Sequence, residues 1–174
     1  AVYAFCRWAD DLADESPDPK TAKTRLGWWR DELNRCMNGE ASHPVFVALR
    51  EVNDHNKLPP EPFHHLIDAF ESDQNQNQWD TWEDLIRYCE GSANPVGRLV
   101  LHLAGESPDG SQLGWSDAVC TGLQLANHWQ DVQRDVIERG RVYIPLELMP
   151  SDDFIDRLMT TAKQGYAPDQ TFLE

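Results

Sequence analysis

The chain has 174 residues, 40% of them hydrophobic and 26% charged, and its formal net charge is −15. This composition is typical of a globular protein rather than a disordered one, and the length is sufficient for a single domain, residues 1–174, with a hydrophobic core. The negative charge argues against nucleic acid as a partner and against a polybasic membrane patch, and an anionic substrate would need metal ions to bridge it to the protein.

The first predicted helix covers residues 1–14. At helical spacing, one face of it is apolar and carries Phe5, Ala9 and Leu12. A second face, within about 60° of arc, carries Tyr3, Arg7, Asp10 and Asp14. The following segment, residues 16–19, contains two prolines and is predicted to be a loop.

Three further helices are predicted over residues 21–37, 43–52 and 61–72. The helix over 21–37 has an apolar stripe formed by Leu26, Trp29, Leu33 and Cys36, and the Asn38-Gly39 pair ends it. The segment 54–60 ends in two prolines and separates the second helix from the third. The third helix is predicted to bury Phe63, Leu66, Ile67 and Phe70.

The second half of the chain opens with a polar tract, residues 73–78, which we interpret as a solvated helix end or a loop. Residues 80–83 resemble a capping box that opens a long helix ending at Leu103, and Pro95 should kink this helix because it removes a backbone hydrogen bond. A loop is predicted over 105–115, a helix over 116–139 that Gly140 ends, and a final helix over 151–163. Because no segment shows sustained period-two alternation, the sequence predicts an all-α protein.

The four cysteines are widely spaced and include no CxxC pair, which favours free thiols in a reducing compartment over disulfides. No run of 18 apolar residues and no signal peptide is recognisable, so no membrane-spanning segment is predicted. The sequence begins without Met and within an already periodic helical pattern. We therefore expect a fragment of a longer protein, with residues missing before Ala1 and after Glu174.

The first candidate site is a DDxxD pattern formed by Asp10, Asp11 and Asp14. Asp10 and Asp14 are one helical turn apart, so both carboxylates can reach the same divalent ion. Mg²⁺ typically takes one or two protein carboxylates and completes its octahedron with water and phosphate oxygens. In a chain with 30 acidic residues, such a pattern on its own is more typical of a solvated acidic face.

A second acidic pattern lies in the helix predicted over 116–139. Its oxygen ligands fall on one narrow face and comprise Gln124, Asn127, Asp131 and Asp135. A neighbouring apolar stripe comprises Leu125, Trp129, Val132 and Val136, so this helix should pack on one side and present ligands on another. Two acidic patterns on separate helices favour a shared magnesium–diphosphate site over two solvated faces.

Arginine and tyrosine side chains accompany both acidic patterns. Arg7 could form an ordinary ion pair along its helix or bind diphosphate bidentately. Arg141 and Tyr143 follow the second pattern, either as a helix-end charge and a half-buried tyrosine or as residues of the substrate site. No zinc site is expected, because His102 and His128 lack His or Cys partners at ligand spacing.

Taken together, residues 3–14 and residues 124–145 resemble the two aspartate-rich motifs of the squalene/phytoene synthase family in sequence, spacing and order. The resemblance implies the all-α isoprenoid-synthase fold, a helical bundle around a deep apolar cavity with both motifs at its mouth. The family fold needs more helices than this chain contains, so we expect part of the cavity wall to be missing.

The resemblance also implies Mg²⁺ as the cofactor and a prenyl diphosphate, farnesyl or presqualene diphosphate, as the substrate. The implied metal ligands are Asp10, Asp14, Asn127, Asp131 and Asp135. The implied substrate-binding residues are Arg7, Gln124, Asn127 and Arg141. The candidate catalytic residues are Tyr3, Arg7 and Tyr143, together with Glu90, which is a separate hypothesis and is not implied by the resemblance.

Residues 88–97, Tyr-Cys-Glu-Gly-Ser-Ala-Asn-Pro-Val-Gly, resemble the hopanoid-pathway branch of the family, which implies conversion of presqualene diphosphate to hydroxysqualene. Many family members carry a catalytic tyrosine where this chain has Glu90, and an arginine where it has Gln130. We hypothesise that Glu90 orients or deprotonates the water that quenches the final cation; the alternative is that it points to solvent. The small residues of this run either admit a polyprenyl chain or serve close helix packing.

Three functions are therefore weighed. The leading one is a Mg²⁺-dependent synthase that forms hydroxysqualene from presqualene diphosphate. The first alternative is head-to-head condensation of two farnesyl diphosphates to presqualene diphosphate, squalene or phytoene, and the second is a non-enzymatic acidic helical module that binds metal ions or a partner helix. We expect a cytoplasmic protein with peripheral contact to the inner membrane face, since the product would be insoluble in water. The sequence does not indicate an oligomeric state.

Overall fold

The computed structural model describes residues 1–106, 109–151 and 153–164. Within these ranges the chain is helical and forms no strand beyond an isolated parallel bridge between Gln78 and Val142. The elements in chain order are α1 (Val2–Asp14), α2 (Pro19–Met37), α3 (Pro44–Asn56), α4 (Glu61–Ser72), α5 (Trp82–Ser92), α6 (Asn94–Leu103), α7 (Gly110–Gln130), α8 (Val132–Arg134), the π-helical turn η1 (Asp135–Arg139), the 3₁₀ turn η2 (Leu146–Leu148) and α9 (Phe154–Gln164). The prediction of an all-α protein is confirmed.

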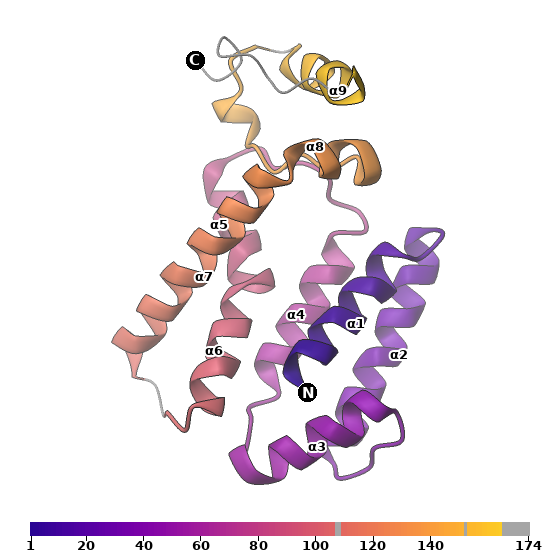
Figure 1. Cartoon of the computed structure of the whole chain (residues 1–174), viewed down its shortest axis with the longest axis vertical. Coiled ribbons are helices and arrows are strands. Elements are labelled where there is room, and N and C mark those ends of the chain that lie inside the picture. The colour runs from indigo at the N-terminus through magenta and orange to yellow at the C-terminus, as the bar shows by residue number, and fades with distance from the viewer. Residues whose placement is uncertain (107–108, 152, 165–174) are drawn as a thin grey trace.

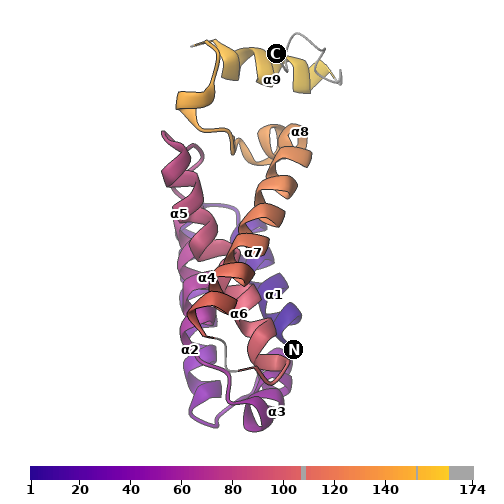
Figure 2. The same ribbon diagram turned by 90° about the vertical axis from the view of Figure 1, so that its left-hand side faces the viewer.

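The long helices form a bundle in which α4, α5 and α6 lie between α1 and α2 on one side and α7 on the other (Figure 1). Helix α3 crosses one end of the bundle, and α8 and α9 lie at the opposite end (Figure 1). Seen from the side, α5 and α7 diverge toward the end occupied by α8 and α9 (Figure 2). Both acidic motifs are therefore carried to the end of the bundle opposite α3.

The main hydrophobic core lies among α1, α2, α3 and α4. Phe5 is fully buried and packs its ring against Trp29, Phe46 and Phe63 at centroid distances of 5.7, 5.9 and 4.9 Å. The apolar stripe predicted for α2 is confirmed, because all four of its side chains are buried. This core packs against one side of α1, and the acidic residues lie in the C-terminal half of the helix.

The helix predicted over residues 80–103 is two helices. The N-cap of α5 is Thr81, whose hydroxyl accepts a hydrogen bond from the backbone N–H of Asp84, so the start predicted at residues 80–83 is wrong by one residue. The break falls at Ala93, and Pro95 lies in the first turn of α6. Backbone N–H groups in the first turn of a helix have no acceptor within the helix, so the absence of this group in proline removes no hydrogen bond there. Pro95 therefore restarts the helix rather than bending it.

Helix α7 differs most from the prediction over residues 116–139. It begins at Gly110, because Asp109 caps its N-terminus and Gln112 completes a capping box, so the loop predicted over 105–115 is wrong in its second half. Helix α7 ends at Gln130. Asp135 lies in the π-helical turn that follows, and Gly140, at φ +63°, ends that turn, so the helical segment stops at the predicted residue. Within the predicted apolar stripe Trp129 is half exposed, which corrects its assignment to the core.

A close contact between α6 and α7 depends on Gly97. A Cβ atom at this position would meet Ser116 Oγ and lie 2.6 Å from Cys120 Sγ, so any other residue would have to displace these two side chains of α7. We expect Gly97→Val to destabilise the fold by about 1–3 kcal/mol through overpacking, measured by urea unfolding. Gly114→Val, at a glycine of α7 with nothing within 4 Å of the added Cβ, is the control for a change of helix propensity alone. Equal losses in the two variants would contradict this prediction.

All four cysteines, at positions 6, 36, 89 and 120, are free thiols. None of the helices described here combines the length and the hydropathy that crossing a bilayer requires.

Candidate diphosphate and metal site

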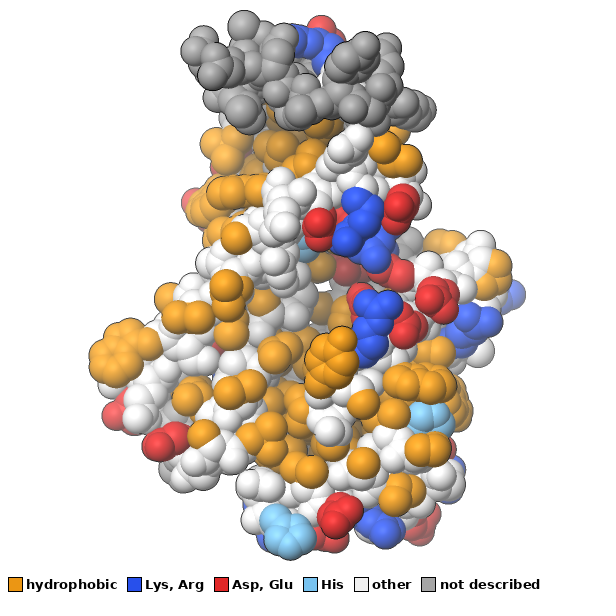
Figure 3. All heavy atoms as spheres, viewed as in Figure 1, with side chains coloured by type: hydrophobic (Ala, Val, Ile, Leu, Met, Phe, Trp, Pro, Cys, Tyr) orange, Lys and Arg blue, Asp and Glu red, His pale blue; other side chains and the backbone are white. Residues whose placement is uncertain are grey.

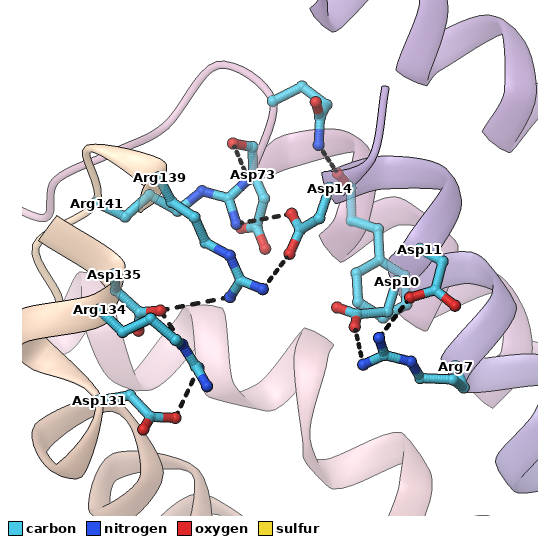
Figure 4. A network of polar contacts seen from close by, with 12 residues as sticks. Arg7, Asp10, Asp11, Asp14, Asp73, Asp131, Arg134, Asp135, Arg139 and Arg141 are labelled. Atoms are coloured by element: carbon cyan, nitrogen blue, oxygen red, sulfur yellow. Dashed lines mark hydrogen bonds and ion pairs between the residues drawn. The ribbon is translucent and has the colours of Figure 1, made fainter. Parts of the chain in front are cut away.

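The structure brings the two acidic motifs together at one end of the bundle (Figure 4). Arg139 joins them, because its Nη2 lies 2.8 Å from Asp14 Oδ2 on α1 and its Nη1 lies 3.4 Å from Asp135 Oδ1. The π-helical turn that places Asp135 and Arg139 is therefore part of the site. Charged side chains gather where these elements meet, and apolar side chains predominate below them on the same face (Figure 3).

Other arginines hold the remaining carboxylates of the two motifs. Arg7 pairs with Asp10 at 3.2 Å and with Asp11 at 2.7 Å along α1. Arg134 pairs with Asp131 at 2.7 Å and lies 3.5 Å from Asp135. Guanidinium groups thus lie beside both acidic motifs, where they are placed to share the charge of a bound diphosphate.

The pKa values of two of these acids reflect a crowded, partly desolvated cluster. Burial and then the neighbouring Asp14 raise the pKa of Asp10, against the opposing effect of Arg7. Burial also raises the pKa of Asp135, a residue that is 3% exposed, although Arg139 and Arg134 oppose this shift. Like charges held close together and away from water favour the binding of a cation.

Asp73 is a site residue that the sequence interpretation missed. It ends α4 and is 9% exposed, and its Oδ2 accepts a hydrogen bond from Tyr88 Oη at 2.8 Å. Arg141 Nη2 donates to its backbone carbonyl at 3.2 Å, and Arg141 Nη1 donates to Asp14 Oδ1 at 3.2 Å. Burial raises the pKa of Asp73 to about 6. The only sequence signal for it was its place as the first residue of the polar tract, directly after a buried helix.

Aromatic rings pack beside Asp73. Tyr143 is 4% exposed and stacks on His128 at 3.6 Å between ring centroids and on Trp79 at 4.6 Å. Tyr88 packs against the same three rings. Burial raises the pKa of Tyr143 to about 12 and lowers the pKa of His128 to about 4, so both side chains are neutral at physiological pH. The backbone of residues 77–80 pairs with residues 142–147 and holds Tyr143 against this cluster.

Comparison with known proteins places this arrangement in a family. Residues 1–164 match the family model of squalene/phytoene synthase. The chain belongs to the squalene/phytoene synthase family. The resemblance seen in the two acidic motifs is thereby confirmed.

Individual members of the squalene/phytoene synthase family show the same relationship. The chain is 39% identical over 150 residues to hydroxysqualene synthase of Rhodopseudomonas palustris and 37% identical over 155 residues to that of Sinorhizobium fredii, each covering 86% of the chain and 50% of the relative. A phytoene synthase of Arthrospira platensis is 30% identical over 159 residues, covering 84% of the chain and 51% of the relative. The chain therefore spans about half the length of the curated relatives it matches.

Solved structures of the family share the helical fold. The crystal structure of squalene synthase HpnC from Alicyclobacillus acidocaldarius superposes with a TM-score of 0.79 at 43% identity, covering 97% of this chain and 61% of that one. A dehydrosqualene synthase in complex with a ligand gives a TM-score of 0.75 at 26% identity, covering 94% and 61%. The isoprenoid-synthase fold predicted from the resemblance is therefore confirmed.

The ion pairs of the cluster involve only some of the predicted site residues. Tyr3 is 80% exposed on α1, and Glu90 is exposed on α5. Asn127 is exposed, Gln124 is partly buried, and the backbone carbonyl of Asn127 accepts the Asp131 N–H at the end of α7. The close contacts of the site instead involve Arg134 and Arg139, along with Asp73, none of which the sequence interpretation assigned to it.

The donor atoms of the two motifs fit Mg²⁺, which prefers carboxylate oxygens. Among the described residues, no group of three or more His, Cys, Asp or Glu side chains is placed to hold a metal ion. Each motif instead offers one or two carboxylates, which is the usual protein contribution to a magnesium–diphosphate site. An apolar groove of about 510 Å³ between α6 and α7, lined by Val100, Trp115 and Val119 among others, lies on the same bundle.

Proposed function

We propose that the protein containing this chain ionises presqualene diphosphate in a Mg²⁺-dependent reaction and forms hydroxysqualene by addition of water to the resulting cation. The observation that carries the proposal is the Arg139 bridge, which holds the first acidic motif on α1 against the second at Asp135. The choice of product is supported by relatives named hydroxysqualene synthase at 37–39% identity, compared with 30% for the phytoene synthase.

The chain's own residues supply binding, orientation and charge. In the proposal, Asp10, Asp14, Asn127, Asp131 and Asp135 hold Mg²⁺. When bound there, the ion supplies Lewis-acid assistance to loss of diphosphate. Arg7, Arg139 and Arg141 share the charge of the departing diphosphate, since guanidinium groups bind phosphate oxygens bidentately.

The aromatic part of the site supports the proposal. Rings such as that of Tyr143, which is 4% exposed, can stabilise positive charge. Tyr3 and Glu90 are exposed in this chain, so they do not carry the proposal. Because the proposed product is insoluble in water, we also propose that the protein is cytoplasmic and releases the product at a membrane surface.

The test uses the native protein that contains this chain, incubated with Mg²⁺ and either presqualene diphosphate or farnesyl diphosphate in ¹⁸O-labelled water. We expect hydroxysqualene from presqualene diphosphate, with ¹⁸O in its hydroxyl group by mass spectrometry, and no product when EDTA removes the metal. Formation of presqualene diphosphate, squalene or phytoene from farnesyl diphosphate would instead establish the head-to-head condensation that relatives named phytoene synthase represent. Metal binding without turnover of either substrate would instead favour the non-enzymatic alternative, an acidic helical module that binds metal ions.

A further inference from the structure

The buried carboxylate of Asp73 joins three parts of the chain that are distant in sequence. Its Oδ2 binds Tyr88 of α5, and its carbonyl at the end of α4 binds Arg141. Its Oδ1 is buried without a hydrogen-bond partner. A buried, unpartnered carboxylate oxygen is unfavourable, so its presence calls for a physical explanation.

Arg141 lies between Asp73 and the first acidic motif. Its side chain is 11% exposed, and one of its terminal nitrogens contacts the Asp73 carbonyl while the other contacts Asp14. The charges of Asp73 and Arg141 also interact directly, which lowers the pKa of Asp73 against the effect of burial. Arg141 is therefore held by the Asp14 carboxylate and by the Asp73 backbone carbonyl, and its charge also interacts with that of the Asp73 carboxylate.

This sharing has a consequence for metal binding. If Asp73 carried no charge, Asp14 would be the sole close carboxylate of Arg141 and would attract it more strongly. A divalent ion that binds Asp14 would then compete with a tighter ion pair. Loss of the Asp73 charge also makes the whole site less negative, which weakens cation binding in the same direction.

The charge on Asp73 is maintained at the expense of stability. Burial, with smaller contributions from Asp14 and Asp10, raises the pKa of Asp73 to about 6, so folding favours its neutral form relative to the unfolded chain. An amide of the same shape would remove the buried charge and still accept a hydrogen bond from Tyr88. Groups that destabilise the fold in this way concentrate at functional sites.

We propose that Asp73 is a positioning residue of the diphosphate site, which shares Arg141 with Asp14 and so leaves Asp14 available to a divalent ion. The proposal rests on the function proposed above, since it concerns the same site. It assigns Asp73 no contact with substrate or metal.

The experiment compares Asp73→Asn with the wild-type native protein and with Asp80→Asn, an exposed acid of the same loop. Mn²⁺ binding is followed by electron paramagnetic resonance in the presence of inorganic pyrophosphate. We expect Asp73→Asn to weaken Mn²⁺ affinity by on the order of tenfold, as for the loss of other residues that orient metal ligands. The affinity of Asp80→Asn should equal that of the wild type.

Thermal unfolding separates this role from a structural one. The pKa of Asp73 is raised in the folded state, so its charge disfavours folding above pH 6, and protonation relieves this at lower pH. The titratable and charged groups that face Asp73 are Arg141, Tyr88, Tyr143, Asp14 and Asp10. We therefore expect Asp73→Asn to raise Tm at pH 7.5, with the difference from wild type shrinking at pH 5.

Unchanged Mn²⁺ affinity in Asp73→Asn, or weaker affinity together with a lower Tm at pH 7.5, would overturn the proposal. If Asp73→Asn does not fold, Tyr88→Phe provides the test. This variant removes the hydroxyl that lowers the pKa of Asp73. Its loss of Mn²⁺ affinity relative to the wild type should therefore be larger at pH 6.5 than at pH 8. Equal loss at both pH values would overturn the idea. A third outcome separates the two proposals. If the wild-type protein binds Mn²⁺ and pyrophosphate, Asp73→Asn weakens that binding, and presqualene diphosphate is not turned over, the proposed reaction is refuted but the role of Asp73 is not.

Discussion

Replacing Asp14 or Asp135 with Asn is expected to lower kcat/KM for the diphosphate substrate by on the order of 10³-fold, because each change removes a charge that stabilises the ionising transition state through bound metal. The two residues come from different motifs and share Arg139, with nitrogen–oxygen distances of 2.8 and 3.4 Å. The activity of the native protein is measured as a function of Mg²⁺ concentration. We expect both variants to need more Mg²⁺ for half-maximal rate.

Asp31→Asn is the matched control, since Asp31 is an exposed acid on α2, a helix on the far side of α1 from the second motif. It removes the same charge from the chain and should leave kcat/KM unchanged. Tm is measured for all three variants to separate loss of activity from loss of fold. A folded Asp14→Asn or Asp135→Asn protein with wild-type Mg²⁺ dependence would show that the acidic motifs do not bind the metal.

Hydrophobic periodicity predicted the first half of the chain well, and the reason is physical. The stripe of α2 faces a core in which Trp29 and Leu33 are fully buried, so the 3.6-residue period of apolar side chains directly reports the packing. The acidic motifs were also found by spacing, because Asp10 and Asp14 must lie one turn apart to share a ligand. The structure adds that the two motifs lie close together.

What periodicity could not predict lies where the backbone leaves the regular helix. The π-helical turn from Asp135 to Arg139 changes which side chains face α1, so helical-wheel arithmetic failed to predict Arg139 at the site. Asp73 was missed because its burial depends on Arg141 and Tyr88, which lie 68 and 15 residues away. A polar tract reads as solvated unless those long-range partners are known.

The same long-range contact leads to a stability prediction for Arg141. We expect Arg141→Met to destabilise the protein by about 3 kcal/mol at pH 8, because it leaves the buried carboxylate of Asp73 without its compensating charge. Arg141→Lys keeps the charge but cannot reach Asp14 and the Asp73 carbonyl with two nitrogens at once, so its loss should be smaller. Denaturant unfolding at several pH values measures both.

The pH dependence identifies the group responsible. Arg141 lowers the pKa of Asp73, so its removal should raise that pKa above its present value of about 6. A group whose pKa is raised in the folded state favours folding when protonated, so the deficit of Arg141→Met should shrink as the pH falls from 8 to 5. The double variant Asp73→Asn/Arg141→Met should regain most of the lost stability at pH 8, since it contains no buried carboxylate at residue 73. A deficit that is independent of pH and persists in the double variant would show that Arg141 stabilises the fold through packing or through Asp14 rather than through Asp73.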